Sequence, residues 1–112
     1  MRLWLDDIRV APKGWIWVKE VIDAIKMLKT GYVEELSLDH DLGEDCPTGY
    51  DLVKWIEEQV HLNDFNPPVM VVHSDNPAGR KNMEAGIASI RKKVIERYSC
   101  KIGIFRVVSQ GK

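Results

Sequence analysis

Three short apolar runs in this sequence each stop abruptly at polar residues that can do chemistry. The runs and the residues that follow them are Leu3–Leu5 with Asp6 and Asp7, Leu36–Leu38 with Asp39–Asp41, and Val69–Val72 with His73 and Ser74. An apolar run that ends in acidic residues is typical of a buried parallel strand whose carboxyl end opens into a site. Ligands of open α/β sheets bind beyond those carboxyl ends, so we expect the three ends to meet.

The rest of the chain alternates strand-like and helix-like segments. We predict strands at Arg2–Asp6, Trp15–Val18, Leu36–Asp39, Val69–Val72 and Ile102–Val108, and helices at Glu20–Lys29, from Thr48 to the Asn63–Pro68 turn, and from Pro77 onward. Thr48 with Asp51 three residues later has the spacing of a capping box, and Asn76 before Pro77 is typical of a helix N-cap. This alternation predicts an α/β domain with a mainly parallel sheet.

The direction of the second strand decides whether the acidic residues meet. A short connection normally joins antiparallel strands, but an antiparallel second strand would send Asp39 to the opposite end of the sheet from Asp6 and Asp7. The connection Ile8–Gly14 can span roughly 25 Å, enough to pass back along a strand of about five residues. We therefore predict that Trp15–Val18 runs parallel to the first strand.

The composition is that of an ordinary globular protein. A length of 112 residues suits a single domain, 1–112, and a net charge of −1 gives no overall attraction to nucleic acid. The basic residues between Arg80 and Arg97 are more typical of a solvated helix face than of a binding surface. Cys46 and Cys100 lack metal-ligand spacing. Since we find no membrane-length apolar stretch and no signal peptide at the start, we expect a cytoplasmic protein.

The strand ends would bring four carboxylates together, those of Asp6, Asp7, Asp39 and Asp41. Carboxylates that lie close repel one another, so either one of them binds a proton or a cation joins them. Carboxylate and phosphate oxygens are the ligands that Mg²⁺ prefers, and Mg²⁺ is the cation that we expect. The alternative is that the acidic residues only end their strands as turn formers.

Two histidines, His40 and His73, follow the same strand ends, and an imidazole titrates near neutral pH. We predict that they move protons as general acid and base, beside Asp39 as a catalytic carboxylate. As metal ligands they would instead favour Mn²⁺ or Zn²⁺ over Mg²⁺. As purely structural residues they would hydrogen-bond to the strand-end backbone.

Four further residues, Ser74, Asn76, Gly79 and Arg80, lie where the last helix begins. Free amides and the helix dipole attract anions there, and an arginine can add a bidentate contact to phosphate. A capping role explains Asn76 alone without any ligand. A cation on one side and an anion site on the other is the arrangement that phosphoryl chemistry uses.

These motifs resemble the receiver domains of two-component response regulators. In those domains an acidic pair ends strand one, an aspartate ends strand three and a hydroxyl residue ends strand four, matching Asp6–Asp7, Asp39 and Ser74. The resemblance implies a flavodoxin-like three-layer sandwich, with helices on both faces of a five-stranded sheet in the order 2-1-3-4-5. The first receiver helix would be missing, which would explain why Asp7 and Asp39 lie closer in sequence than is usual in receivers.

More closely, the whole chain resembles the cyclic-phosphate processing receiver domains. The matching motifs are Leu5–Arg9, Ser37–Gly43, Thr48–Asp51 and His73–Arg80. The resemblance implies processing of cyclic phosphates or phosphorylated RNA ends, with partner proteins from an RNA-repair or signalling system. Ordinary receivers follow their last strand with a lysine and a proline, and Ile104–Val108 offers no such pair.

The sequence therefore predicts a receiver-like domain with a divalent-metal site that binds a phosphate ester and, as a phosphoesterase, would hydrolyse it. The ligand would be a phosphate-containing small molecule or an RNA end that carries a cyclic phosphate. Two alternatives stay open: a signalling receiver that is phosphorylated on Asp39, and a metal- and phosphate-binding module without turnover.

Overall fold

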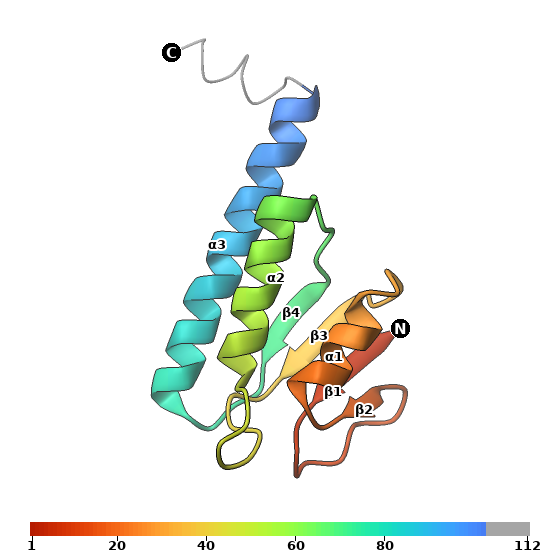
Figure 1. Cartoon of the computed structure of the whole chain (residues 1–112), viewed down its shortest axis with the longest axis vertical. Helices are drawn as coiled ribbons and strands as arrows, with labels where there is room; N and C mark the ends of the chain where they lie inside the picture. Colours follow the sequence, from red (N-terminus) through yellow and green to blue (C-terminus); the bar gives the residue numbers. More distant parts are fainter. Residues whose placement is uncertain (103–112) are drawn as a thin grey trace.

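The computed structural model describes residues 1–102, with side chains as far as Ser99 (Figure 1). Within that range the strands are β1 (Arg2–Leu5), β2 (Ile16–Val18), β3 (Glu35–Leu38) and β4 (Val69–Val72), and the helices are α1 (Val21–Leu28), α2 (Gly49–Asn63) and α3 (Pro77–Ile102). These elements follow the predicted order. The predicted fifth strand, Ile102–Val108, lies outside the described residues except for Ile102, which ends α3.

The four strands form one parallel sheet in the order β2-β1-β3-β4. β2 runs parallel to β1, which confirms the prediction that Trp15–Val18 is parallel to the first strand. The loop between β1 and β2 contains no helix. Hydrogen bonds extend the ladder one residue past the strands, from the amide of Asp39 to Leu5 (3.0 Å) and from that of His73 to Leu38 (3.1 Å). Asp6, Asp39 and His73 therefore form the next row across the sheet.

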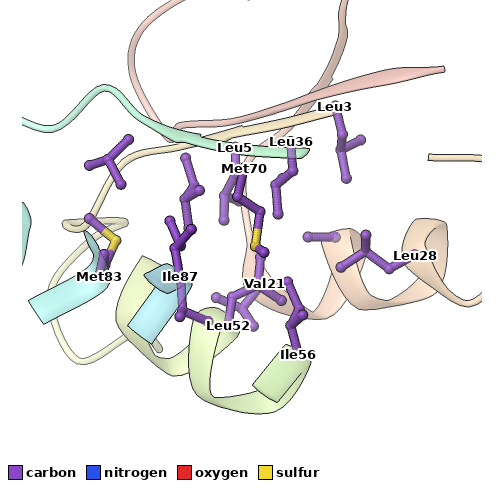
Figure 2. Packing of buried hydrophobic residues seen from close by; sticks show 14 of the residues in the cluster. Leu3, Leu5, Val21, Leu28, Leu36, Leu52, Ile56, Met70, Met83 and Ile87 are labelled. Atoms are coloured by element: carbon purple, nitrogen blue, oxygen red, sulfur yellow. The ribbon is translucent and has the colours of Figure 1, made fainter. Parts of the chain in front are cut away.

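One face of the sheet packs against all three helices (Figure 2). The buried core comprises Leu3, Leu5, Val18, Leu36, Leu38, Met70 and Val72 from the sheet, Val21, Ala24 and Leu28 from α1, Leu42 from the loop after β3, Leu52, Val53, Ile56 and Val60 from α2, and Met83, Ile87 and Ile90 from α3. Each fully buried valine, leucine, isoleucine or methionine side chain stabilises the fold by roughly 1.5–3 kcal/mol relative to leaving that side chain exposed. This single core holds the carboxyl ends of the strands in register.

The opposite face of the sheet carries no described helix. Trp4 lies there, with the ring of His73 stacked on it at 3.8 Å between centroids and Trp15 against it edge to face at 6.1 Å. The described residues thus form two layers, and the predicted three-layer sandwich with helices on both faces is wrong for them. The reason is that the β1–β2 connection is a loop, so aromatic rings cover part of this face where a helix would otherwise lie.

The helix starts follow the predicted capping chemistry. The amide of Asp51 donates to Oγ1 of Thr48 (3.2 Å) and the amide of Thr48 donates to Oδ2 of Asp51 (2.8 Å), which completes the capping box of α2. Oδ1 of Asn76 accepts the amide of Gly79 (3.0 Å) at the start of α3. None of the described helices is long and apolar enough to cross a membrane.

Candidate functional site

Three aspartates gather where β1 and β3 end. Asp6 and Asp7 follow β1, Asp39 follows β3, and one carboxylate oxygen from each lies within 4.8 Å of the others. We call these three residues the aspartate cluster. Asp6 is buried, whereas Asp7 and Asp39 are half-buried. Negative charges this close, partly shielded from water, repel one another unless a proton or a cation joins them.

Asp6 is held by hydrogen bonds on both carboxylate oxygens. Oδ1 accepts the amides of Ile8 (2.9 Å) and Arg9 (2.8 Å), and Oδ2 lies 3.0 Å from Nε2 of His73. The carbonyl of Asp6 also accepts the indole N–H of Trp17 (2.7 Å). Burial alone would raise the pKa of Asp6, but the hydrogen bonds from Arg9, Ile8 and His73 outweigh burial and lower it. Asp6 is therefore a fixed, negatively charged carboxylate at neutral pH.

The imidazole of His73 links Asp6 to the middle of the sheet. Burial lowers the pKa of His73 in spite of the opposing effect of Asp6, so the ring is neutral at neutral pH. A carboxylate can only accept, so Nε2 carries the proton, and Nδ1 accepts the hydroxyl of Ser37 at 2.8 Å. Both ring nitrogens are thus engaged within the domain. Sequence reasoning gave Ser37 no role, because only the strand register shows that it neighbours His73.

Asp39 is positioned by the start of α2. Its Oδ1 accepts the amide of His40 (2.8 Å), and the amide of Gly49 donates to the carbonyl of His40 (2.9 Å). Gly49 lies so close that a Cβ at this position would stand 2.0 Å from the carbonyl oxygen of Asp39. The absence of a side chain at Gly49 lets α2 begin directly beside the aspartate cluster.

A second group of polar side chains ties the loop after β3 to the start of α3. Nδ1 of His40 lies 2.9 Å from Oδ1 of Asp41, and Nδ2 of Asn76 donates to Oδ2 of Asp41 at 3.2 Å. These hydrogen bonds, first from His40 and then from Asn76, lower the pKa of Asp41. The ring of His40 packs on the backbone of Gly79, where a Cβ would come within 2.4 Å of the ring. The loop is therefore fixed against the helix.

An open cavity of about 590 Å³ lies over the aspartate cluster, and Asp41 and Glu44 add further acidic groups to its lining. Arg9 is the one cationic side chain among the described residues that line it. Its Nη1 donates to the carbonyl of His73 (2.7 Å) and its Nη2 pairs with Asp75, while the side chain stays 44% exposed. The cavity is thus lined by several acidic groups and by one partly exposed arginine side chain.

Comparison with profiles of protein families gives a match over residues 1–89 to the cyclic-phosphate processing receiver domain. The chain belongs to this family. The matched range contains the aspartate cluster, both histidines and the start of α3, and it confirms the resemblance that the motifs predict. Comparison with curated proteins and with solved structures gave no match.

The predicted metal ligands of this receiver domain separate into two groups. Asp6, Asp7 and Asp39 form the aspartate cluster. Asp41 lines the same cavity but lies outside the cluster, because its carboxylate is bonded to His40 and Asn76. The loop turns away from the strand ends after Asp39, which carries Asp41 toward α3.

The predicted phosphate-binding residues of the receiver domain all lie at the start of α3, where several of their polar groups already have partners. Oγ of Ser74 accepts the amide of Asn76 (3.1 Å), and Asn76 in turn caps Gly79. Nε of Arg80 lies 3.6 Å from Glu84, and the Arg80 side chain is about half exposed. Phosphate binding by these residues stays a prediction. Arg9 is the anion-binding candidate that the sequence analysis did not assign, although it belongs to the Leu5–Arg9 motif.

Proposed function

We propose that this receiver domain binds a divalent cation and a phosphate ester at the aspartate cluster and hydrolyses a cyclic phosphate on a nucleotide or an RNA end. The observation that carries the proposal is the approach of three carboxylates to within 4.8 Å at the meeting point of two strand ends. Membership of a family described as cyclic-phosphate processing supports this class of substrate.

The donor set fits a hard divalent cation. Three carboxylates supply oxygen ligands, and Mg²⁺ typically takes one or two carboxylates together with waters and substrate phosphate oxygens. The lowered pKa of Asp6 keeps that carboxylate charged and able to accept a cation. When bound, the ion would offset the repulsion among Asp6, Asp7 and Asp39 and supply positive charge to a phosphate. Mn²⁺ and Zn²⁺ are the alternatives if an imidazole joins the ligands.

Arg9 is the side chain that we propose holds the phosphate beside the cation. Arg9 lines the cavity and its side chain is 44% exposed. A planar guanidinium can bind two phosphate oxygens at once, and here it would exchange its pairing with Asp75 for the phosphate. Ser74, Asn76 and Gly79 would act mainly by fixing the start of α3 behind the site. Arg80, which is half-exposed and lies 3.6 Å from Glu84, is the predicted phosphate residue best able to turn toward a ligand.

The two histidines would serve the reaction in different ways. Nδ1 of His40 pairs with Asp41, and none of the described hydrogen bonds involves Nε2, so Nε2 is the nitrogen to which we assign proton exchange. His40 is not among the residues that line the cavity, and its side chain is 18% exposed, so its ring would have to turn toward the ester. Both ring nitrogens of His73 are hydrogen-bonded within the domain, to Ser37 and to Asp6. We therefore propose that His73 positions the carboxylate of Asp6. The alternative is that His73 moves protons, as the sequence predicts. The kinetics of the His73 and His40 variants distinguish these two roles.

The test is hydrolysis of 2′,3′-cyclic nucleotides, and of RNA with cyclic ends, in Mg²⁺ or Mn²⁺, with products separated by chromatography. We expect Asp39→Asn to abolish turnover, while Asp23→Asn in α1 serves as a control with the same chemical change outside the site. His40→Gln should lower the rate by about 10²–10⁴-fold without weakening cation binding. His73→Gln should lower the rate and cation affinity together. No turnover by the wild-type chain with either metal and either substrate would refute the hydrolase part of the proposal.

A phospho-accepting signalling role is the second candidate function, with Asp39 as the acceptor. It is favoured by the place of Asp39 at the end of β3 beside Asp6 and Asp7, as in response-regulator receivers. We expect little durable adduct with acetyl phosphate or beryllofluoride, because Ile104–Val108 lacks the lysine–proline pair. An adduct that persists in intact-mass spectra, and is lost in Asp39→Asn, would favour signalling over hydrolysis.

A further inference from the structure

Ser37 is a buried polar residue in the middle of the sheet. It pairs with Trp4 of β1 on one side and with Val71 of β4 on the other, and it is 5% exposed. A buried hydroxyl destabilises a fold unless it has a hydrogen-bond partner. Here the partner is an imidazole, because Oγ of Ser37 lies 2.8 Å from Nδ1 of His73.

Ser37, His73 and Asp6 form a continuous chain of hydrogen bonds that ends at the aspartate cluster. Nε2 of His73 lies 3.0 Å from Oδ2 of Asp6, and the two side chains are 15% and 1% exposed. One end of this chain is therefore a hydroxyl inside the sheet, and the other end is a carboxylate of the proposed cation site.

A serine, a histidine and an aspartate in this order are also the groups of a nucleophilic triad. A nucleophile must reach its substrate, however, and Ser37 is buried and is not among the residues that line the cavity over the aspartate cluster. The burial of the hydroxyl rules out direct attack on a phosphate in that cavity. Ser37 can still act on the site through His73.

Stacking fixes the plane of the His73 ring but not which way round the ring lies in that plane. The indole of Trp4 lies parallel to the imidazole, with 3.8 Å between the centroids and 5° between the planes. The torsion that turns an imidazole is roughly twofold, so a half-turn keeps the stacking while it exchanges ring nitrogens for ring carbons. The turned ring would present C–H groups to both Ser37 and Asp6.

The hydrogen bond to Ser37 selects one of these two orientations without involving the carboxylate. If only Asp6 selected the orientation, the ring would depend on the group that it positions. A cation that shares Oδ2 of Asp6 would then weaken the hold on the ring. The hydroxyl of Ser37 contacts the other ring nitrogen, so its hydrogen bond is independent of the cation.

We propose that Ser37 is a positioning residue for the cation site, because its hydroxyl holds the His73 ring in the orientation that presents Nε2 to Asp6. This inference rests on the proposed function, since it takes Asp6 as a ligand of the cation. Removal of a group that orients a metal ligand typically lowers metal affinity 10–100-fold. Ser37 acts one step further back, so we expect the lower end of that range, about tenfold.

The experiment is a double-mutant cycle of Ser37→Ala and His73→Gln, in which electron paramagnetic resonance measures the Mn²⁺ affinity of the full chain. Ser37→Ala should weaken binding about tenfold when His73 is present and should have no further effect in His73→Gln. Ser89→Ala is the control and should bind Mn²⁺ like wild type, because it removes a hydroxyl hydrogen bond of 2.7 Å to Glu57 outside the site.

A spectroscopic readout follows the ring of His73 directly in the metal-free chain. In ¹⁵N NMR spectra of histidine-labelled protein, His73 is the residue whose signals are absent from His73→Gln. Its two ring nitrogens should keep their wild-type shifts in Ser89→Ala and change in Ser37→Ala. Ser37→Cys has a weaker donor and should give intermediate shifts and an intermediate affinity, so it keeps the test valid if Ser37→Ala fails to fold.

Three results would overturn this inference and leave the proposed function standing. They are wild-type Mn²⁺ affinity in Ser37→Ala, an equal loss of affinity with and without His73, and unchanged His73 ring signals in Ser37→Ala. The second result would mean that the hydroxyl only stabilises the sheet. A wild-type chain that binds no Mn²⁺ would instead overturn the cation site, and this inference with it.

Discussion

Replacing Gly49 with alanine tests the claim that close packing places Asp39. Alanine is worth about 1 kcal/mol more than glycine in a helix, so propensity alone predicts a more stable protein. In the structure, however, the added Cβ would stand 2.0 Å from the carbonyl oxygen of Asp39 and 2.9 Å from Sδ of Met83. The flexible methionine can give way, but the Asp39 carbonyl belongs to the end of β3 and cannot move without disturbing the aspartate cluster.

Overpacking of this kind costs typically about 1–3 kcal/mol, and contact with backbone argues for the upper end. Subtracting the helix-propensity gain of up to about 1 kcal/mol leaves a net destabilisation of about 2 kcal/mol. For a domain of this size, that lowers the melting temperature by roughly 8–16 °C. Thermal unfolding followed by circular dichroism measures it. The rise in melting temperature that a divalent cation causes should also shrink in Gly49→Ala.

The matched control is Gly31→Ala at the end of α1. Gly31 has φ +81° and open space around it, so the alanine is penalised by conformation, at roughly 1–2 kcal/mol, and not by contact. Its loss of stability should therefore resemble that of Gly49→Ala, while the effect of the cation stays at the wild-type level. A Gly49→Ala protein that melts at or above the wild-type temperature would refute the reasoning.

Two further predictions concern the stability of the cation-free protein. Thr48→Ala removes half of the capping box and should cost about 1 kcal/mol, seen as a lower urea midpoint; an unchanged midpoint would mean that the cap contributes nothing. Folding lowers the pKa of both His73 and Asp6, so the unfolded chain binds more protons and stability falls as the solution is acidified. For His73 the loss begins as pH falls through its ordinary value of 6.5, and for Asp6 it follows below 3.8. Urea unfolding at a series of pH values should show a shallower decline near pH 6.5 in His73→Gln, and a wild-type stability that rises on acidification would contradict the assignment.

The parts of the site that follow strand order were predictable from sequence. Carboxyl ends of neighbouring parallel strands must meet, so apolar runs followed by Asp6, Asp7 and Asp39 were enough to predict the cluster. The parallel direction of β2 followed from the same requirement. The start of α3 was predictable as well, since an asparagine before a proline is a strong helix signal.

Other features depend on contacts that spacing along the chain does not reveal. We grouped Asp41 with the other predicted metal ligands. The chain turns after Asp39, however, and the Asp41 carboxylate accepts a hydrogen bond from Asn76 at the start of α3. The link from Ser37 to His73 arises because both side chains lie on the same face of adjacent strands, which requires the register. The three-layer expectation came from the resemblance to ordinary receivers, and the alternation of Leu3 and Trp4 did not show which face would lack helices.

The most direct test of the central claim is a titration of the full chain with Mn²⁺, in which the free ion is measured by its electron paramagnetic resonance signal. We predict one bound ion per chain, displaced by Mg²⁺, and loss of binding in Asp39→Asn but not in the control Asp23→Asn. At a free concentration of about 100 times the Kd, binding should also add about 2.7 kcal/mol to the free energy of unfolding. A wild-type chain that binds no Mn²⁺, or an Asp39→Asn chain that binds it as tightly as wild type, would contradict the assignment of the aspartate cluster as a metal site.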